Sequence, residues 1–215
     1  MNKIGFYFLL IIAILQGNLM GAIIKHIDIK GVQIPVIFEE QKSLPILNLQ
    51  LVFENSGYIQ DKNKSGLVSL SSKLLNEGTK ELGVTKFAEK LEENAISLTA
   101  SNGFETFVIE LSSLKEQSPK GIELLTALLK SPNFTQSTLD KLKTIQKGSL
   151  KRKENDFDYV SNNQLKSILF KGTALEKPAA GTVESISKIE LKDIQNFVHQ
   201  TVCLENLIIV AGGDF

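Results

Sequence analysis

Between residues 66 and 79 the chain reads Gly66-Leu67-Val68-Ser69-Leu70-Ser71-Ser72-Lys73-Leu74-Leu75-Asn76-Glu77-Gly78-Thr79. The spacing i, i+3, i+4 and i+7 predicts a helix with one buried face, which carries Leu67, Leu70, Ser71 and Leu74. Gly78 stands where such a helix would end in a left-handed cap. At 100° per residue, Ser69, Ser72 and Lys73 project from the opposite face. The simplest interpretation of that second face is the solvated side of an amphipathic helix.

The segments before this helix have the patterns of strands. Residues Ile23 to Ile29 and Val32 to Phe38 are rich in β-branched side chains, and Lys30-Gly31 between them predicts a hairpin. Pro35 lies in the second run and predicts an edge position or a bulge, because proline cannot donate a hydrogen bond to a neighbouring strand. From Leu47 to Phe53 apolar and polar residues alternate, which predicts a strand with one buried face.

The segments after it predict helices and strands in an irregular order. Thr85 is expected to cap a helix that runs to Asn94, and Asn102-Gly103 predicts a turn between two strands. The further expectations are strands over 96–101, 106–112 and 206–211, a helix opening at Ser118-Pro119, helical regions over 135–157, 159–170 and 189–201, and a loop over 171–182. This order predicts an α+β fold and not a regular parallel βαβ array.

Composition limits the possible partners. The 215 residues, of which 42% are hydrophobic, suffice for one domain with a sizeable core. Lys+Arg and Asp+Glu both number 24, so the charge balance does not support binding to nucleic acid or to an anionic membrane.

The N-terminus has the pattern of a secretory signal. Lys3 precedes the apolar run from Phe6 to Leu15, and small residues follow at Gly21 and Ala22. We therefore predict a signal peptide over residues 1–22, a mature domain over 23–215, a periplasmic or secreted location, and no stable membrane span after cleavage. An uncleaved anchor is the less favoured alternative. Cys203 is the only cysteine, which excludes an internal disulfide.

Several separate segments resemble peptidase family M16, the family of pitrilysin, insulinase and the mitochondrial processing peptidase. Gly66, Leu67, Leu75, Gly78 and Thr79 match the frame around that family's inverted zinc motif, His-x-x-Glu-His. The stretch Gly181-Thr182-Val183-Glu184-Ser185-Ile186 resembles the family's Gly-Thr-Glu-Glu-Ser-Ile, and 193–210 resembles its closing helix and strand. The resemblance covers most of residues 25–215. It implies a two-layer α+β sandwich of the LuxS and mitochondrial processing peptidase type, with a mixed, largely antiparallel sheet packed on helices.

The positions that carry the family's chemistry hold other residues here. Ser69, Ser72 and Lys73 stand in place of His, Glu and His, and Ser149 stands where the resemblance places the glutamate that completes the zinc site. Leu142 replaces a supporting acid of the family. A catalytic zinc needs about three ligands from His, Glu, Asp or Cys, and its water needs a general base. We therefore expect no bound zinc, no cofactor and no catalytic residue in this chain, which is the prediction of a non-catalytic homologue.

Other candidate sites are weaker. His199 and Cys203 lie four apart on an expected helix, but two ligands do not make a metal site. Ser69, Ser71 or Ser72 beside Lys73 could suggest a Ser/Lys pair, although no strained nucleophile turn accompanies them. The basic run 147–153 is balanced by following acids, and Gly212 to Phe215 is the exit of a strand.

The leading functional hypothesis is a subunit that works beside a partner with an intact His-x-x-Glu-His motif in the processing of peptides or proteins. The resemblance implies such pairs of active and inactive subunits, with zinc in the partner. In this hypothesis an edge strand offers its backbone to an extended peptide, and it comprises Ile96, Ser97, Leu98, Thr99, Ala100 and Ser101. The alternatives are a stand-alone peptide-binding or scaffold protein of the cell envelope and, last, an active metalloendopeptidase.

Overall fold

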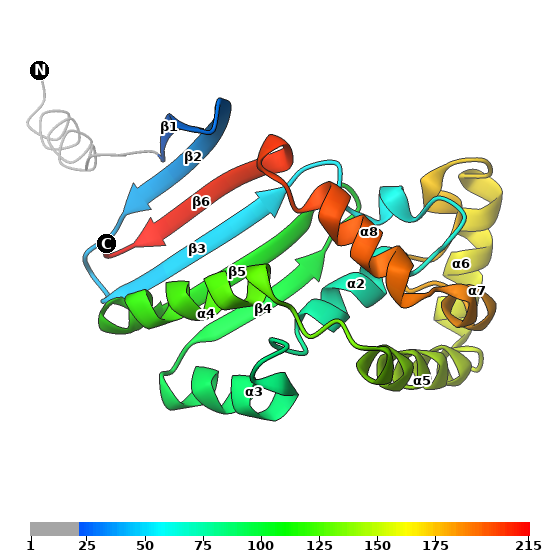
Figure 1. The fold of residues 1–215 in the computed structure, drawn as a ribbon. Helices are drawn as coiled ribbons and strands as arrows, with labels where there is room; N and C mark the ends of the chain where they lie inside the picture. The colour runs from blue at the N-terminus through cyan, green and yellow to red at the C-terminus, as the bar shows by residue number, and fades with distance from the viewer. Residues whose placement is uncertain (1–21) are drawn as a thin grey trace, which may run out of the picture.

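The computed structural model describes residues 22–215, so the predicted signal peptide lies, except for Ala22, outside the described residues. The described chain forms one six-stranded sheet with helices packed on it (Figure 1). Its strands are β1 (Ile23–Ile29), β2 (Val32–Glu40), β3 (Ile46–Phe53), β4 (Ser97–Asn102), β5 (Phe107–Leu114) and β6 (Leu207–Gly213). Its α-helices are α2 (Leu67–Leu75), α3 (Gly83–Glu93), α4 (Ser118–Lys130), α5 (Gln136–Lys153), α6 (Phe157–Leu169), α7 (Val183–Lys188) and α8 (Leu191–Thr201). Four short 3-10 helices connect them: η1 (Tyr58–Asp61), η2 (Lys115–Gln117), η3 (Ala174–Glu176) and η4 (Leu204–Asn206).

The sheet has the strand order β1-β2-β6-β3-β5-β4. Only β2 and β6 pair in parallel, and every other neighbouring pair is antiparallel. This confirms the predicted α+β fold with a mixed, largely antiparallel sheet. The hairpin of β1 and β2 turns where it was predicted, at Lys30 and Gly31, which have φ angles of 55° and 84°.

The prediction that Pro35 marks an edge strand needs a correction. Strand β2 is internal, because β1 pairs on one side of it and β6 on the other. The pairing with β6 begins only at Val36, so Pro35 faces no partner strand on that side. A missing N–H group costs nothing at such a position, which is why proline is tolerated there.

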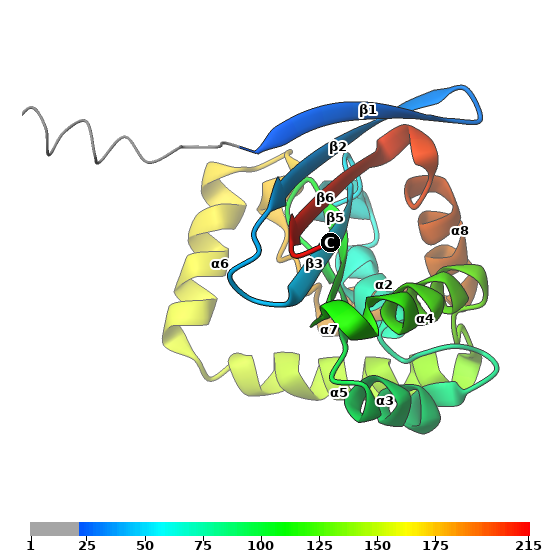
Figure 2. The same cartoon turned by 90° about the vertical axis from the view of Figure 1, so that its left-hand side faces the viewer.

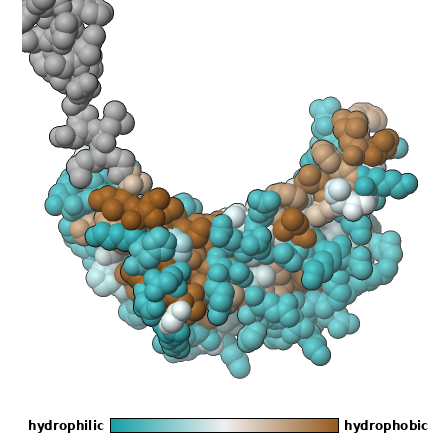
Figure 3. All heavy atoms as spheres, turned by 90° about the horizontal axis from the view of Figure 1, so that it is seen from above, coloured by the Kyte–Doolittle hydropathy of each residue, from teal (hydrophilic) through white to brown (hydrophobic). Residues whose placement is uncertain are grey.

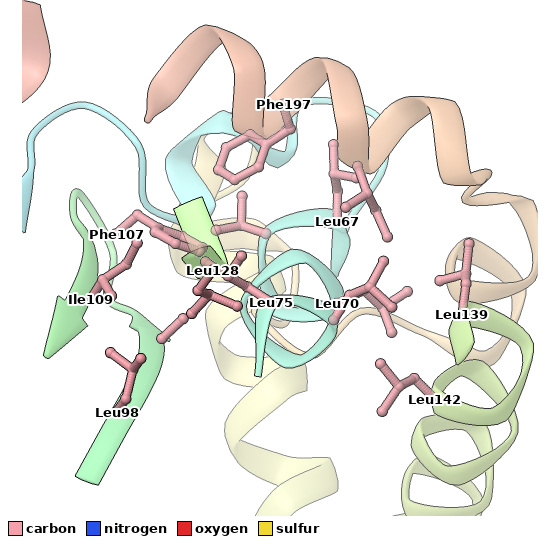
Figure 4. Packing of buried hydrophobic residues seen from close by; sticks show 14 of the residues in the cluster. Leu67, Leu70, Leu75, Leu98, Phe107, Ile109, Leu128, Leu139, Leu142 and Phe197 are labelled. Atoms are coloured by element: carbon pink, nitrogen blue, oxygen red, sulfur yellow. The ribbon is translucent and has the colours of Figure 1, made fainter. Parts of the chain in front are cut away.

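The helices α2, α3, α4 and α8 cover one face of the sheet, whereas α6 projects on the other side (Figure 2). The core lies between that covered face and the helices. Helix α2 passes through its centre, and Leu70 and Leu74 are fully buried (Figure 4). The leucine stripe predicted from spacing is therefore the buried stripe in the structure, where α2 packs against β4 and α8 and, on its far side, against Leu139 and Leu142 of α5.

Two further differences from the sequence prediction concern the start of one helix and the presence of another. Helix α3 begins at Gly83, two residues before Thr85, after a turn in which the Thr79 hydroxyl accepts the N–H of Leu82 at 3.2 Å. Helix α7 was not predicted, yet Thr182 and Ser185 form a capping box that starts it. None of the helices within residues 22–215 is long and apolar enough to span a bilayer.

Candidate functional site

Helix α2 begins where two distant segments meet. The hydroxyl of Ser65 donates to the carbonyl of Pro178 at 2.8 Å, and that of Ser185 donates to the carbonyl of Ser65 at 2.7 Å. Gly66, with φ of 91°, lies so near the other segment that a Cβ on it would be 3.1 Å from the Cα of Gly181. The two stretches that carry the family resemblance therefore pack against each other.

Asp61 holds the first turn of α2. Its carboxylate accepts the N–H groups of Gly66 at 2.7 Å and Val68 at 2.9 Å, which have no partner within the helix. The side chain is only 7% exposed. Burial raises the pKa of Asp61 to about 6, although the hydrogen bonds from the backbone act in the opposite direction.

This pKa predicts a pH dependence of stability. Between about pH 4 and 6 the folded carboxyl holds a proton that the unfolded chain has lost, so the free energy of unfolding should fall as pH rises through that window. A shift from 3.8 to about 6 corresponds to about 3 kcal/mol. We expect the stability of Asp61→Asn relative to the wild type to rise by about that amount between pH 4 and 7 in denaturant titrations.

Asp158→Asn, at an exposed position of α6, is the control and should show no such trend. A trend of the opposite sign would show that the backbone N–H groups, and not burial, dominate the ionisation of Asp61.

The second face of α2 carries the residues that replace the family's zinc motif. Ser72 is 5% exposed, and its hydroxyl lies 3.1 Å from the carbonyl oxygen of Ser69 and 3.0 Å from Oδ1 of Asn102, at the end of β4. Near the end of the helix, the Asn76 amide binds both the N–H and the carbonyl of Ala100 in the same strand. Hydrogen bonds therefore fix α2 to β4 along this face.

Lys73 joins α2 to α5. Its ammonium donates to Oε1 of Gln146 at 2.5 Å, and the amide nitrogen of Gln146 donates to the carbonyl of Ala180 at 2.7 Å. Gln146 is 2% exposed, so this relay runs from the exposed Lys73 side chain into the interior. Desolvation first, and the charge of Lys153 second, lower the pKa of Lys73.

These residues do not fit a zinc ion. Ser149 lies on α5 one turn after Gln146, so the structure does bring the helix of Ser149 to the helix of Ser69 and Lys73. Serine hydroxyls are weak zinc ligands, however, and an ammonium repels a divalent cation. Within residues 22–215 no three His, Cys, Asp or Glu side chains gather as a metal site would require. Leu142 is buried in the core beside them.

The predicted peptide-binding strand is an edge of the sheet, as expected. Strand β4 begins at Ser97 and ends at Asn102, so it is displaced by one residue from the predicted range, and Ile96 precedes it. Leu98 and Ala100 face the core, whereas Ser97, Thr99 and Ser101 are exposed. Among the strands of residues 22–215, β4 pairs with β5 alone, on one side.

The weaker candidates separate in the structure. Helix α8 ends at Thr201, so Cys203 lies beyond it and the expected helical pair with His199 is wrong. The thiol of Cys203 lies 3.6 Å from the Gln200 carbonyl oxygen, and burial raises the pKa of this thiol. Asp214, in the strand exit, pairs with Lys115 at 2.6 Å.

Three residues of the site were not singled out in the sequence: Asp61, Asn102 and Gln146. Gln146 had a detectable signal, since it is a polar residue on the same helical stripe as Leu139, Leu142 and Leu150. Asn102 was assigned only to a turn. Asp61 lies in a loop whose course depends on tertiary contacts.

Comparisons with known proteins support the same family as the sequence motifs. The family model described as Insulinase (Peptidase family M16) matches residues 36–183. The non-peptidase homolog YmxG of Helicobacter pylori is 44% identical over 207 residues, which are 95% of this chain and 48% of that protein. The present chain thus spans about half the length of this relative.

Two solved structures share the fold at low identity. An inactive domain of peptidase M16 from Pseudomonas fluorescens has a TM-score of 0.82 at 22% identity, and the match covers 90% of this chain and 47% of that one. The periplasmic protease PqqL from Escherichia coli has a TM-score of 0.76 at 14% identity, covering 91% and 23%. A non-peptidase homolog and an inactive domain among these proteins agree with the prediction that this chain is not itself a peptidase. The chain belongs to peptidase family M16, the insulinase family.

Proposed function

We propose that this protein is a non-catalytic subunit that works beside a zinc-bearing M16 peptidase and forms one wall of a shared substrate chamber. The observation that carries the proposal is the contrast within α2. Its buried face and both flanking glycines keep the family frame, whereas Ser69, Ser72 and Lys73 replace the zinc motif. A fold that is retained without its zinc-binding residues can still serve as a structural subunit beside an active partner.

Exposed apolar surface supports a partner. No residue of α6 is buried, and Phe157 is 89% exposed. The large apolar side chains that α6 exposes are Phe157, Val160, Leu165, Ile168 and Leu169. Strand β1 exposes three more, namely Ile23, Ile24 and Ile27. Seen from above, the surface is hollowed between the apolar area by β1 and the projecting α6 (Figure 3). Apolar surface of this kind marks an interaction site in a soluble protein.

The edge position of β4 supports a role in binding peptide, which would pair with the backbone groups beside Ala100 because Asn76 occupies the N–H and carbonyl of Ala100 itself. Ser97, Thr99 and Ser101 are exposed along it, and an extended peptide could add to it as a further strand. Zinc would be held by the partner. The periplasm is the proposed location, which the N-terminal signal pattern and the fold shared with a periplasmic protease support.

The test is co-purification of the tagged protein from its native cells. We expect a complex whose second chain carries an intact His-x-x-Glu-His motif and about one zinc ion. Recovery of the protein only as a monomer would contradict the proposal and favour a stand-alone binding or scaffold protein.

Helix α6 provides a sharper version of this test. Replacing Leu165 and Ile168 together with aspartate should abolish recovery of the zinc-bearing chain, because it places two charges in the proposed interface. These side chains are 53% and 67% exposed, so thermal unfolding of the isolated protein should change little. Asn162→Asp, an exposed position on the same helix, is the control. Undiminished recovery with the double variant would show that α6 does not contact the partner.

A further inference from the structure

The side chain of Asn76 occupies the middle of the outer edge of β4, the side of this strand that faces away from β5. Its Oδ1 accepts the N–H of Ala100 at 2.6 Å, and its Nδ2 donates to the carbonyl of Ala100 at 2.9 Å. A side-chain amide carries the same types of donor and acceptor as a backbone peptide group. Asn76 therefore makes the pair of hydrogen bonds that a residue of an added strand would make.

Other backbone groups share this outer edge. Along an antiparallel strand, successive residues direct their N–H and carbonyl groups alternately to one side and to the other. Because both groups of Ala100 are bonded on the outer side, Leu98 and Asn102, two positions away, direct theirs to the same side. Ile96 belongs to the same set, and its N–H donates to the carbonyl of Leu91 at 2.9 Å. The chain therefore occupies the outer edge at two of these four positions.

The contact between Asn76 and Ala100 can open without a change in α2. Asn76 caps the C-terminal end of this helix through its backbone, whose N–H donates to the carbonyl of Ser72 at 3.2 Å. Both hydrogen bonds of the Asn76 side chain go to Ala100, so a rotation of that side chain frees the strand and keeps the helix end. The Ser72 hydroxyl, 3.0 Å from Oδ1 of Asn102, still holds α2 beside β4. Asn76 is exposed, so water can replace its bonds.

We propose that Asn76 controls access to the outer edge of β4, so that an extended peptide pairs continuously with this strand only after the Asn76 side chain has turned away from Ala100. With Asn76 in place, a peptide reaches the groups of Leu98 and Asn102 on either side of an occupied position. The proposal rests on the proposed function in taking β4 as the peptide-binding edge. It requires no partner subunit.

The test is a titration with the probe N-acetyl-Thr-Val-Thr-Val-Thr amide, whose β-branched residues favour an extended strand. We expect Asn76→Ala to bind the probe about tenfold more tightly than the wild type, because binding no longer breaks two hydrogen bonds. The NMR amide signals of Leu98 and Ala100 should shift during the titration. The same peptide N-methylated at two consecutive central residues should lose this gain, because one of the two missing N–H groups faces β4.

Hydrogen exchange at the Ala100 N–H provides a second measurement. Exchange should be about tenfold faster in Asn76→Ala than in the wild type, and it should slow again when the probe saturates the variant. Asn206→Ala is the matched control. It removes an amide that donates to the carbonyl of Thr201 at 3.3 Å, just before β6, which β3 and β5 separate from β4. This control should keep the wild-type affinity and exchange rate.

Equal affinity of the wild type and Asn76→Ala for the probe would overturn the proposal. Faster exchange at Ala100 that the probe does not slow would overturn it too. Asn76→Asp keeps an acceptor for the Ala100 N–H but loses the donor, so its affinity should be intermediate, and it provides the test if Asn76→Ala fails to fold. A monomer on co-purification, with tighter binding by Asn76→Ala, would contradict only the proposed partnership.

Discussion

Replacing Gly66 with alanine is expected to lower the free energy of unfolding by about 3 kcal/mol. Two costs add at this position. Its φ of 91° lies in the left-handed region, which alanine adopts only at a cost of about 1–2 kcal/mol. A Cβ would also lie 2.6 Å from the Cδ1 of Ile186 and 3.0 Å from the Ala180 carbonyl oxygen, and the backbone atom can retreat little.

Gly31→Ala is the matched control for this prediction. Gly31 has nearly the same φ, 84°, but a Cβ there would meet nothing within 4 Å. Its substitution should therefore cost only the backbone term, about 1 kcal/mol. Urea unfolding of both variants measures the difference. Equal losses would show that the packing of Gly66 on 180–186 contributes nothing, and that the two family segments meet without mutual constraint.

The fold was predictable because its local signals agree with its tertiary contacts. Alternation in β3 and leucine spacing in α2 each identify the face that the structure buries, whereas the β-branched residues of β1 predict its strand but stay mostly exposed. The strand order could not be derived in this way, because the parallel pairing of β2 with β6 joins residues about 170 positions apart and leaves no local pattern. The error at Pro35 has the same origin.

The sequence predicted which zinc-binding residues are missing from the site, but not which contacts the residues in their place make. The resemblance located Ser69, Ser72, Lys73 and Ser149, and the structure places α2 against α5 as that alignment requires. The hydrogen bonds that Lys73 and Ser72 make depend on Gln146 and Asn102, which belong to no motif of the family. Their roles follow from side-chain reach between elements, which spacing along the chain does not encode.

Restoring three zinc ligands should restore zinc binding. We expect the variant Ser69→His, Lys73→His and Ser149→Glu to retain about one zinc ion per chain after dialysis, whereas the wild type retains none. The relay supports this expectation, because the Lys73 ammonium already reaches α5 at Gln146, one turn before Ser149. Metal analysis of the purified protein, with circular dichroism to verify folding, measures the result.

The control for the zinc variant keeps Lys73 and carries only Ser69→His and Ser149→Glu. It should bind no zinc, because it has two ligands and an ammonium at the third position. Hydrolysis would need Ser72→Glu as well, since the metal-bound water requires a general base. If the three-ligand variant folds but stays free of zinc, then the spacing of α2 and α5 has changed along with the side chains. The chain would then have lost the geometry of the metal site, and no substitution at these positions alone could recover it.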